Sequence, residues 1–174
     1  MIIRSISLLI LLFSTISTSW AQQGRTLNWV LGESVLIDFS SGIPITGESA
    51  IDSFEGLSVI SDTEGNLQFY TDGITVWNAN HLIMSNGTGL LSSYTATNAA
   101  LIVPLPLNKD IYYIFTVAGQ AGYGGSFGGA AYSIVDMSLN DGLGEIIEKN
   151  TILQTKTTEK LCGTQHENNI DYWI

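Results

Sequence analysis

The sequence of 174 residues predicts an all-β fold, a partial β-propeller-like array of about three blades, with a β-sandwich as the alternative. Short runs of β-branched and aromatic residues recur between glycine, asparagine and aspartate, which is the pattern of strands and turns. No window of a dozen residues carries an apolar stripe at helical spacing between recognisable caps. A weak internal repeat is the third observation, and it favours blades.

The repeat is a four-residue pattern of Asn or Asp, Leu or Ile, any residue, and an aromatic residue. It starts at Asn66, Asp110 and Asn169, and each copy follows a short turn after a strand-like stretch (58–61, 100–103 and 162–165). The first interval, 44 residues, is typical of a four-stranded propeller blade, which takes roughly 40–50 residues. The second interval, 59 residues, requires an insertion, and the glycine-rich segment Gly119–Gly129 is the obvious place for it.

Ten strands are expected from these runs. In chain order they are Asn28–Leu31, Leu36–Phe39, Leu57–Ser61, Leu67–Thr71, Ile74–Trp77, Ala99–Val103, Ile111–Val117, Ala131–Met137, Gly144–Glu148 and Asp171–Ile174. Asp72-Gly73 predicts a tight two-residue hairpin turn, because both central residues of a type I′ turn need positive φ. Asn86-Gly87 and Asp141-Gly142 predict further turns or loops.

The faces of two predicted strands carry information about packing. Leu67 and Phe69 alternate with Gln68 and Tyr70, which predicts a half-buried strand. Ile111–Val117 is apolar on both faces, so we expect neighbouring sheets to cover both sides of it.

The first 21 residues are predicted to be a signal peptide rather than part of the fold. Arg4 supplies the positive start, residues 6–13 the apolar region, and Ser19-Trp20-Ala21 the small-residue cleavage signal before Gln22. The apolar run is well short of the roughly 20 residues needed to cross a bilayer, and no later stretch is long enough. Residues 22–174 are therefore expected to be a secreted or cell-surface domain without membrane insertion after cleavage.

Composition narrows the class of partner. Without residues 1–21, five Lys or Arg and sixteen Asp or Glu remain among 153 residues, a net charge of −11. This excess of acid argues against nucleic acid as a partner. The single cysteine, Cys162, allows no internal disulfide, and a small buried hydrophobic residue is the favoured interpretation over a reactive thiol.

Several linked motifs resemble the amino-terminal region of large gliding-motility-associated bacterial surface proteins, which leave the cell by type IX secretion. The matching segments are Asn28-Trp29 with Leu31-Gly32, Ile37-Asp38-Phe39, Ser61 through Gly73, Met84 through Leu90, Ile102-Val103-Pro104, Tyr112 through Val117, Tyr132 through Met137, and His166 through Trp173. The resemblance covers nearly all of residues 22–174. It implies a propeller-like extracellular region that precedes immunoglobulin-like modules of the polycystic-kidney-disease type and a carboxy-terminal sorting domain.

The resemblance also implies what lies beyond this sequence. Neither the modules nor the sorting domain is present, and the sequence stops inside a strand-like run at Ile174. We therefore expect a chain truncated at its carboxy terminus, with further modules of the same longer chain as partners. The family offers no catalytic residues to transfer.

The acidic run Asp62-Thr63-Glu64-Gly65-Asn66 raises the question of a metal loop. Oxygen ligands from Asp62 and Glu64 would suit calcium, but the EF-hand pattern fails, because Leu67 and Gly73 occupy its sixth and twelfth positions. Aspartate, glycine and asparagine are also what a tight turn requires. A turn between two strands is the favoured interpretation, and calcium binding at Asp62 and Glu64 is the alternative.

Other motifs predict no chemistry. Gly122–Gly129 has Phe127 where a dinucleotide loop needs its third glycine, so a surface loop is favoured. His81 and His166 stand 85 residues apart without His or Cys neighbours, which argues against zinc; a hydrogen bond within a turn is expected for His166. Asn86-Gly87-Thr88 is a glycosylation sequon. No catalytic, cofactor or metal residue is predicted.

The sequence thus predicts a non-enzymatic exported surface or secreted module for adhesion or for binding glycans or proteins. One alternative is an extracellular propeller-type hydrolase acting on polysaccharide, which needs two carboxylates about 5–10 Å apart in one pocket. The other is a structural spacer, which should have no concave aromatic surface.

Overall fold

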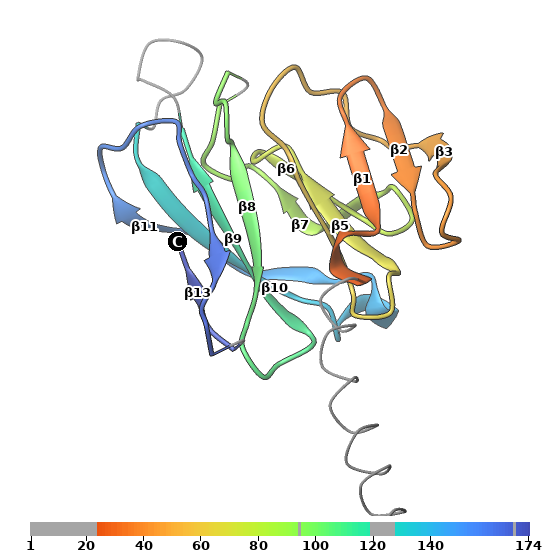
Figure 1. Ribbon diagram of the computed structural model, residues 1–174. Helices are drawn as coiled ribbons and strands as arrows, with labels where there is room; N and C mark the ends of the chain where they lie inside the picture. Colours follow the sequence, from red (N-terminus) through yellow and green to blue (C-terminus); the bar gives the residue numbers. More distant parts are fainter. Residues whose placement is uncertain (1–23, 94, 119–127, 169) are drawn as a thin grey trace, which may run out of the picture.

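The computed structural model describes residues 24–93, 95–118, 128–168 and 170–174 (Figure 1). Its regular structure consists of thirteen strands and two 3-10 turns, η1 (Gly24–Thr26) and η2 (Asn140–Gly142), so the predicted all-β class is confirmed. The predicted signal peptide, residues 1–21, lies outside the described residues. Within them, no helix is long and apolar enough to span a membrane.

The strands form three successive antiparallel meanders and a terminal hairpin. The first meander consists of β1 (Asn28–Leu31), β2 (Val35–Asp38) and β3 (Ile45–Glu48). The second consists of β4 (Ser58–Ser61), β5 (Leu67–Thr71), β6 (Thr75–Asn78) and β7 (Ile83–Thr88). The third consists of β8 (Ala100–Pro104), β9 (Ile111–Val117), β10 (Ala130–Asp136) and β11 (Glu145–Gln154), and the hairpin consists of β12 (Thr164–Gln165) and β13 (Tyr172–Trp173).

The second and third meanders join into one curled eight-stranded sheet. A parallel pairing of Ser85 on β7 with Glu145 on β11 connects them at one edge. At the other edge β4 and β8 approach each other, and the Ile102 N–H donates a hydrogen bond to Ser58 Oγ (3.2 Å). The sheet is therefore nearly closed around a common interior, and we call it the barrel.

Two apolar cores hold the stack of meanders together. The core between the second and third meanders consists of Ile60, Phe69, Val76, Met84, Leu90, Ala100, Ile102, Tyr112, Ile114, Val135, Met137 and Ile146. The core between the first and second consists of Val30, Ile51 and Tyr70, with Leu36, Leu57, Val59, Leu67 and Trp77 packed against them. Each fully buried side chain of this size contributes roughly 1.5–3 kcal/mol relative to exposure.

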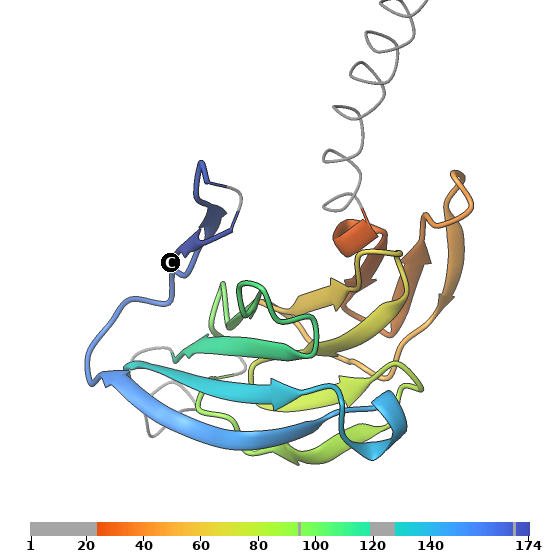
Figure 2. The same ribbon diagram turned by 90° about the horizontal axis from the view of Figure 1, so that it is seen from below.

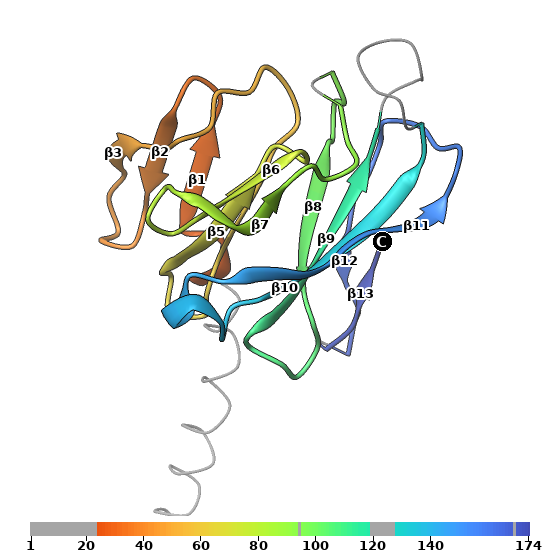
Figure 3. The same ribbon diagram turned by 180° about the vertical axis from the view of Figure 1, so that it is seen from behind.

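The first strands of successive meanders lie side by side. Asn28 of β1 donates to Ser61 Oγ of β4 (3.1 Å), and Ile102 of β8 donates to β4 as described above. Gly163, immediately before β12, sits so close to Leu101 of β8 that a Cβ there would lie 2.8 Å from Leu101 Cδ2. As Figures 1 and 3 show, the first meander and the terminal hairpin flank the two central meanders on opposite sides.

The internal repeat marks an equivalent place in the fold. Its first two copies run into β5 and β9, and its third copy ends at Tyr172, the first residue of β13; these are the second strands of their meanders or hairpin.

Several strands differ from the sequence-based prediction. Ile45–Glu48, an exposed edge strand interrupted by Gly47, and Ile83–Thr88 were not predicted. Asn86-Gly87, predicted as a turn, lies inside β7: Asn86 has φ of 57° and the β6–β7 register shifts here, which describes a bulge. A Cβ on Gly87 would meet Met84 O at 2.7 Å.

The predicted two-residue hairpin at Asp72-Gly73 is wrong in its geometry. Three residues, 72–74, separate β5 from β6, and only Gly73 has positive φ (86°). Asp72 stays out of the left-handed region because its carboxylate accepts hydrogen bonds from the backbone N–H groups of Ile74 and Thr75.

The expected cover over both faces of β9 is complete on the inner face and only partial on the outer face. Tyr112, Ile114 and Thr116 are buried in the interior, whereas Tyr113 and Phe115 are only half-buried on the outer face. There their rings stack with each other at 5.9 Å and contact Tyr132 of β10. The hairpin β12–β13 stands over this side of the sheet (Figure 2).

Candidate functional site

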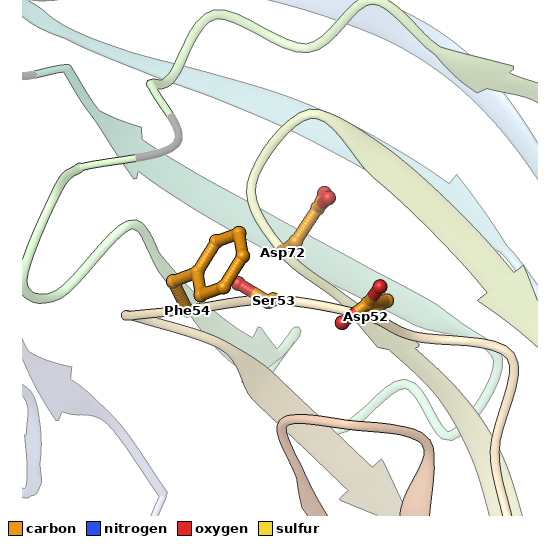
Figure 4. Close-up of a pocket in the computed structure, with 4 residues that line it drawn as sticks. All are labelled: Asp52, Ser53, Phe54 and Asp72. Carbon is orange, nitrogen blue, oxygen red and sulfur yellow. The ribbon is translucent and has the colours of Figure 1, made fainter.

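A cavity of about 190 Å³ lies at the end of the barrel where β5 turns into β6 (Figure 4). It is lined by Asp52, Ser53 and Phe54 from the segment between β3 and β4, and by Asp72 from the β5–β6 turn. The Phe54 ring and the Asp72 carboxylate project to the same side, and the Asp52 carboxylate lies at the other end of the short run. We call this the Phe54 pocket.

The segment that carries Phe54 is anchored at three points. Ile51 is fully buried, and its carbonyl accepts hydrogen bonds from the Ser34 backbone N–H (2.9 Å) and hydroxyl (3.3 Å). The Ser53 carbonyl packs against Gly32, where a Cβ would lie 2.4 Å from it. Gly56 donates to the Ala96 carbonyl and lies in a gap too narrow for any side chain, since a Cβ would be 2.3 Å from Ala99 N. The anchors on both sides of Phe54 fix where its backbone runs.

Asp72 is fixed as firmly. Its Oδ1 accepts hydrogen bonds from Ile74 N (2.8 Å) and Thr75 N (2.7 Å), whereas no bond is recorded for its Oδ2 among the described residues. The adjacent Gly73 packs against the Ser92 side chain and the Ala99 carbonyl. The orientation of the Asp72 carboxylate is therefore set before any ligand arrives.

Phe54 itself is 91% exposed, although its neighbour Ile51 is completely buried. A phenylalanine left in water forgoes roughly 1.5–3 kcal/mol of burial free energy. An aromatic ring that lines a concavity together with a few placed polar groups is an arrangement found in ligand sites.

A second concavity, of about 430 Å³, lies at the opposite end of the barrel, between the β8–β9 turn and the terminal hairpin. Its lining residues are Arg25, Thr63, Pro104, Leu105, Pro106, Leu107, Asn108, Lys109, Gln165, Ile170 and Tyr172. We call this the Arg25 groove. It contains two of the six Lys and Arg residues of the chain and no acidic lining residue.

The Asp62 turn has a structural role. Asp62 Oδ1 accepts the N–H groups of Glu64 (2.9 Å) and Asn66 (2.8 Å), and Oδ2 accepts the side-chain amides of Asn66 (2.9 Å) and Gln68 (3.2 Å). Glu64 instead points to Thr63, whose hydroxyl donates to it (2.9 Å). The carboxylate of Asp62 is thus used by the turn itself, which supports the interpretation favoured from the sequence over calcium. Among the described residues no group of three or more His, Cys, Asp or Glu side chains is placed to hold a metal.

The two histidines occupy unrelated places. His166 Nδ1 accepts the Asn168 N–H (3.1 Å) in the β12–β13 turn, which confirms the hydrogen bond predicted there. His81 Nδ1 lies 2.9 Å from Tyr70 Oη, which also accepts the Ala50 N–H (2.9 Å). Burial raises the pKa of Tyr70 above its ordinary value of 10.0, and the Ala50 hydrogen bond opposes that shift.

The structure also bears on the sequence-based predictions for Cys162, for the sequon and for the glycine-rich segment. Cys162 is exposed, so the prediction of a buried cysteine is wrong; it lies on the irregular segment that crosses the surface between β11 and β12. The sequon asparagine, Asn86, donates to Ile146 O (2.8 Å) and accepts from Lys149 Nζ (2.7 Å), so its amide is engaged within the fold. The glycine-rich segment lies mostly outside the described residues.

The sequence-based prediction missed the residues of both concavities. Asp72 was interpreted only as a turn residue, and Phe54 was not singled out. A lone phenylalanine between Asp52-Ser53 and Glu55-Gly56 was the available signal, because a polar loop has no apolar face in which to bury it. The second available signal was that Arg25 and Lys109 are two of only six Lys and Arg residues in an acidic chain.

No known protein family, curated protein or solved structure matches this chain.

Proposed function

We propose that the protein is a non-enzymatic, exported surface or secreted module that binds glycans through the Phe54 pocket. The observation that carries this proposal is the 91% exposed Phe54 ring, held on an anchored segment beside the Asp52 and Asp72 carboxylates and the Ser53 hydroxyl.

The chemistry of the pocket suits a sugar ring. The electron-rich face of an aromatic ring attracts the C–H groups on the apolar face of a pyranose, and fixed carboxylates accept hydrogen bonds from vicinal hydroxyl groups. Asp72 Oδ2 and both Asp52 oxygens have no recorded partner among the described residues, so acceptors remain for a ligand. A volume of about 190 Å³ accommodates one ring rather than a long chain, so the contact would be with a terminal or single projecting sugar.

The same geometry gives less support to the two alternatives. A glycosidase needs one carboxyl group in apolar surroundings to serve as the acid. Asp52 is instead exposed to solvent, and Asp72 is bonded by two backbone N–H groups. A spacer does not need a concavity in which an aromatic ring and carboxylates lie together.

The proposal also includes export from the cell and a relationship to a family of bacterial surface proteins. The signal-peptide pattern of residues 1–21 supports a secreted or cell-surface location, and the linked motifs support a relationship to gliding-motility-associated proteins of the type IX pathway. In that setting the module would contribute to adhesion, with further modules of a longer chain as its neighbours.

The proposal is tested with purified protein comprising residues 22–174 on an array of neutral and acidic glycans, followed by titration calorimetry with the best binder. We expect Phe54→Ala to weaken binding at least about tenfold, and Asp72→Asn to weaken it by a smaller factor. Leu107→Ala is the matched control, because Leu107 is 93% exposed at the opposite end of the barrel. Equal affinities of Phe54→Ala and the parent protein would overturn the proposed site, and release of reducing sugar from the bound glycan would favour the hydrolase.

A further inference from the structure

The Arg25 groove combines two features that do not occur together elsewhere among the described concavities: an apolar lining and concentrated positive charge. Six of its eleven lining residues are apolar or aromatic, namely Pro104, Leu105, Pro106, Leu107, Ile170 and Tyr172. The chain around it has sixteen acidic residues against six basic ones. Two of those six, Arg25 and Lys109, reach this one groove although they are 84 residues apart in sequence.

Both cations remain available to a ligand. Arg25 has a single recorded interaction among the described residues, a long hydrogen bond from Nη1 to Tyr112 Oη (3.5 Å). This bond orients the guanidinium, and no carboxylate pairs with Arg25 among the described residues. Lys109 pairs with its neighbour Asp110 at 3.1 Å, but the Lys109 side chain is 89% exposed, and solvent screens exposed pairs of this kind.

The groove is walled by three separate parts of the fold. The β8–β9 turn supplies residues 105–109, the terminal hairpin supplies Gln165, Ile170 and Tyr172, and η1 with the Asp62 turn supplies Arg25 and Thr63. The β8–β9 turn is a defined structure, because Leu105 donates to Ile111 O (2.9 Å) and the Asp110 N–H donates to Asn108 Oδ1 (3.0 Å). Leu107 is 93% exposed at its tip.

We propose that the Arg25 groove binds an extended peptide segment of a partner protein in which acidic and apolar side chains alternate. Carboxylates of such a segment pair with Arg25 and Lys109, and its apolar side chains pack against the proline, leucine and isoleucine walls. A volume of about 430 Å³ lies within the usual range of ligand sites, roughly 300–1,000 Å³.

A peptide fits this lining better than an acidic polysaccharide. A uronate chain also carries carboxylates, but its many hydroxyl groups need polar partners, and the uncharged polar groups here are those of Thr63, Asn108, Gln165 and the Tyr172 hydroxyl. A hydroxyl placed against proline and leucine loses its hydrogen bonds to water without gaining others. The groove is separate from the Phe54 pocket, so this proposal stands or falls independently of glycan binding.

The test uses a short capped peptide in which glutamate and leucine alternate, a matched peptide with glutamine for glutamate, and polygalacturonate, each titrated against residues 22–174 by fluorescence anisotropy. We expect saturable binding of the glutamate–leucine peptide, weakened at least about fivefold by Lys109→Ala, by Arg25→Gln, or by raising NaCl from about 0.05 M to about 0.5 M. The glutamine peptide should bind at least about fivefold more weakly.

Two control variants make the result specific. Lys156→Ala removes an equal charge at the other end of the barrel, beside Thr157, whose N–H bonds to Gly128 O, and it should leave the affinity unchanged. Phe54→Ala should also leave it unchanged. Absence of saturable binding by the glutamate–leucine peptide, equal effects of Lys109→Ala and Lys156→Ala, or preferential binding of polygalacturonate would overturn the proposal. Because Lys109 is an exposed turn residue, Lys109→Ala tests it even if Arg25→Gln disturbs folding.

Discussion

Phe69 and Tyr112 meet edge to face between the second and third meanders, with ring centroids 5.4 Å apart and an interplanar angle of 89°. Phe69 comes from β5 and Tyr112 from β9, and both are almost completely buried. Both lie near the start of the second strand of their meander. Their contact joins the second and third meanders inside the common core.

This contact predicts that Phe69→Ala lowers the free energy of unfolding by about 3–5 kcal/mol, because it leaves a cavity and removes an aromatic pair. Phe54→Ala is the matched control: the same substitution at a 91% exposed ring should change stability by less than about 0.5 kcal/mol. Chemical denaturation monitored by tryptophan fluorescence measures both. Similar losses for the two variants would contradict the assignment of Phe69 to the core.

The buried hydroxyl of Tyr70 makes the free energy of unfolding depend on pH in the alkaline range. Its pKa is raised by burial, so the folded state holds the proton more tightly than the unfolded state. The stabilising contribution is complete below the unfolded pKa of 10.0 and is lost as pH rises through the higher folded value.

Tyr70→Phe separates this effect from the other tyrosines. At neutral pH the variant should be less stable by about 1–3 kcal/mol, because Ala50 N–H and His81 Nδ1 lose their common partner. The difference between parent and variant should shrink above pH 10, as thermal melts between neutral pH and strongly alkaline pH would show. A constant difference across that range would argue that Tyr70 does not titrate with unfolding.

The Asp62 turn predicts unequal effects of its two acidic residues. Asp62→Ala removes the acceptor of four hydrogen bonds and should cost about 1–2 kcal/mol, whereas Glu64→Ala removes one contact and should cost less than about 0.5 kcal/mol. Calcium chelation should leave the melting temperature unchanged. If chelation lowered it strongly and both variants abolished that response, calcium would be a ligand of the turn.

The exposure of Cys162 predicts ready access of a thiol reagent. Native protein should react stoichiometrically with an aromatic disulfide reagent at mildly alkaline pH without denaturant, and Cys162→Ser should abolish the reaction. Absorbance of the released thiolate follows the reaction. Labelling that begins only after denaturation would restore the buried interpretation drawn from the sequence.

Cleavage of the signal peptide is a separate prediction. Protein exported by a native-like host should begin at Gln22, because Ser19-Trp20-Ala21 provides the small-residue cleavage signal. Amino-terminal sequencing or intact mass measures this directly. Exported material that still begins at Met1 would show that the segment has another role.

Most of the local structure follows from neighbouring residues in the sequence. Three strands were predicted with the bounds that the structure has: Asn28–Leu31, Leu67–Thr71 and Ile111–Val117. Their bounds could be predicted because the two-residue alternation of a strand is recognisable from consecutive residues. The repeat marks the second strands of the second and third meanders and of the terminal hairpin, and Asp62 kept its turn because its hydrogen bonds reach no further than Gln68.

Which distant residues come into contact depends on how the meanders pack together. Asn86-Gly87 has the local chemistry of a turn, yet it forms a bulge because β7 pairs with both β6 and β11. Phe54 and Asp72 come together through anchors at Ile51, Gly56 and Gly73, and Arg25 reaches Lys109 across 84 residues of sequence. These arrangements depend on the packing of whole meanders against one another. The free energy of that packing comes from residues far apart in sequence, so a local pattern does not predict it.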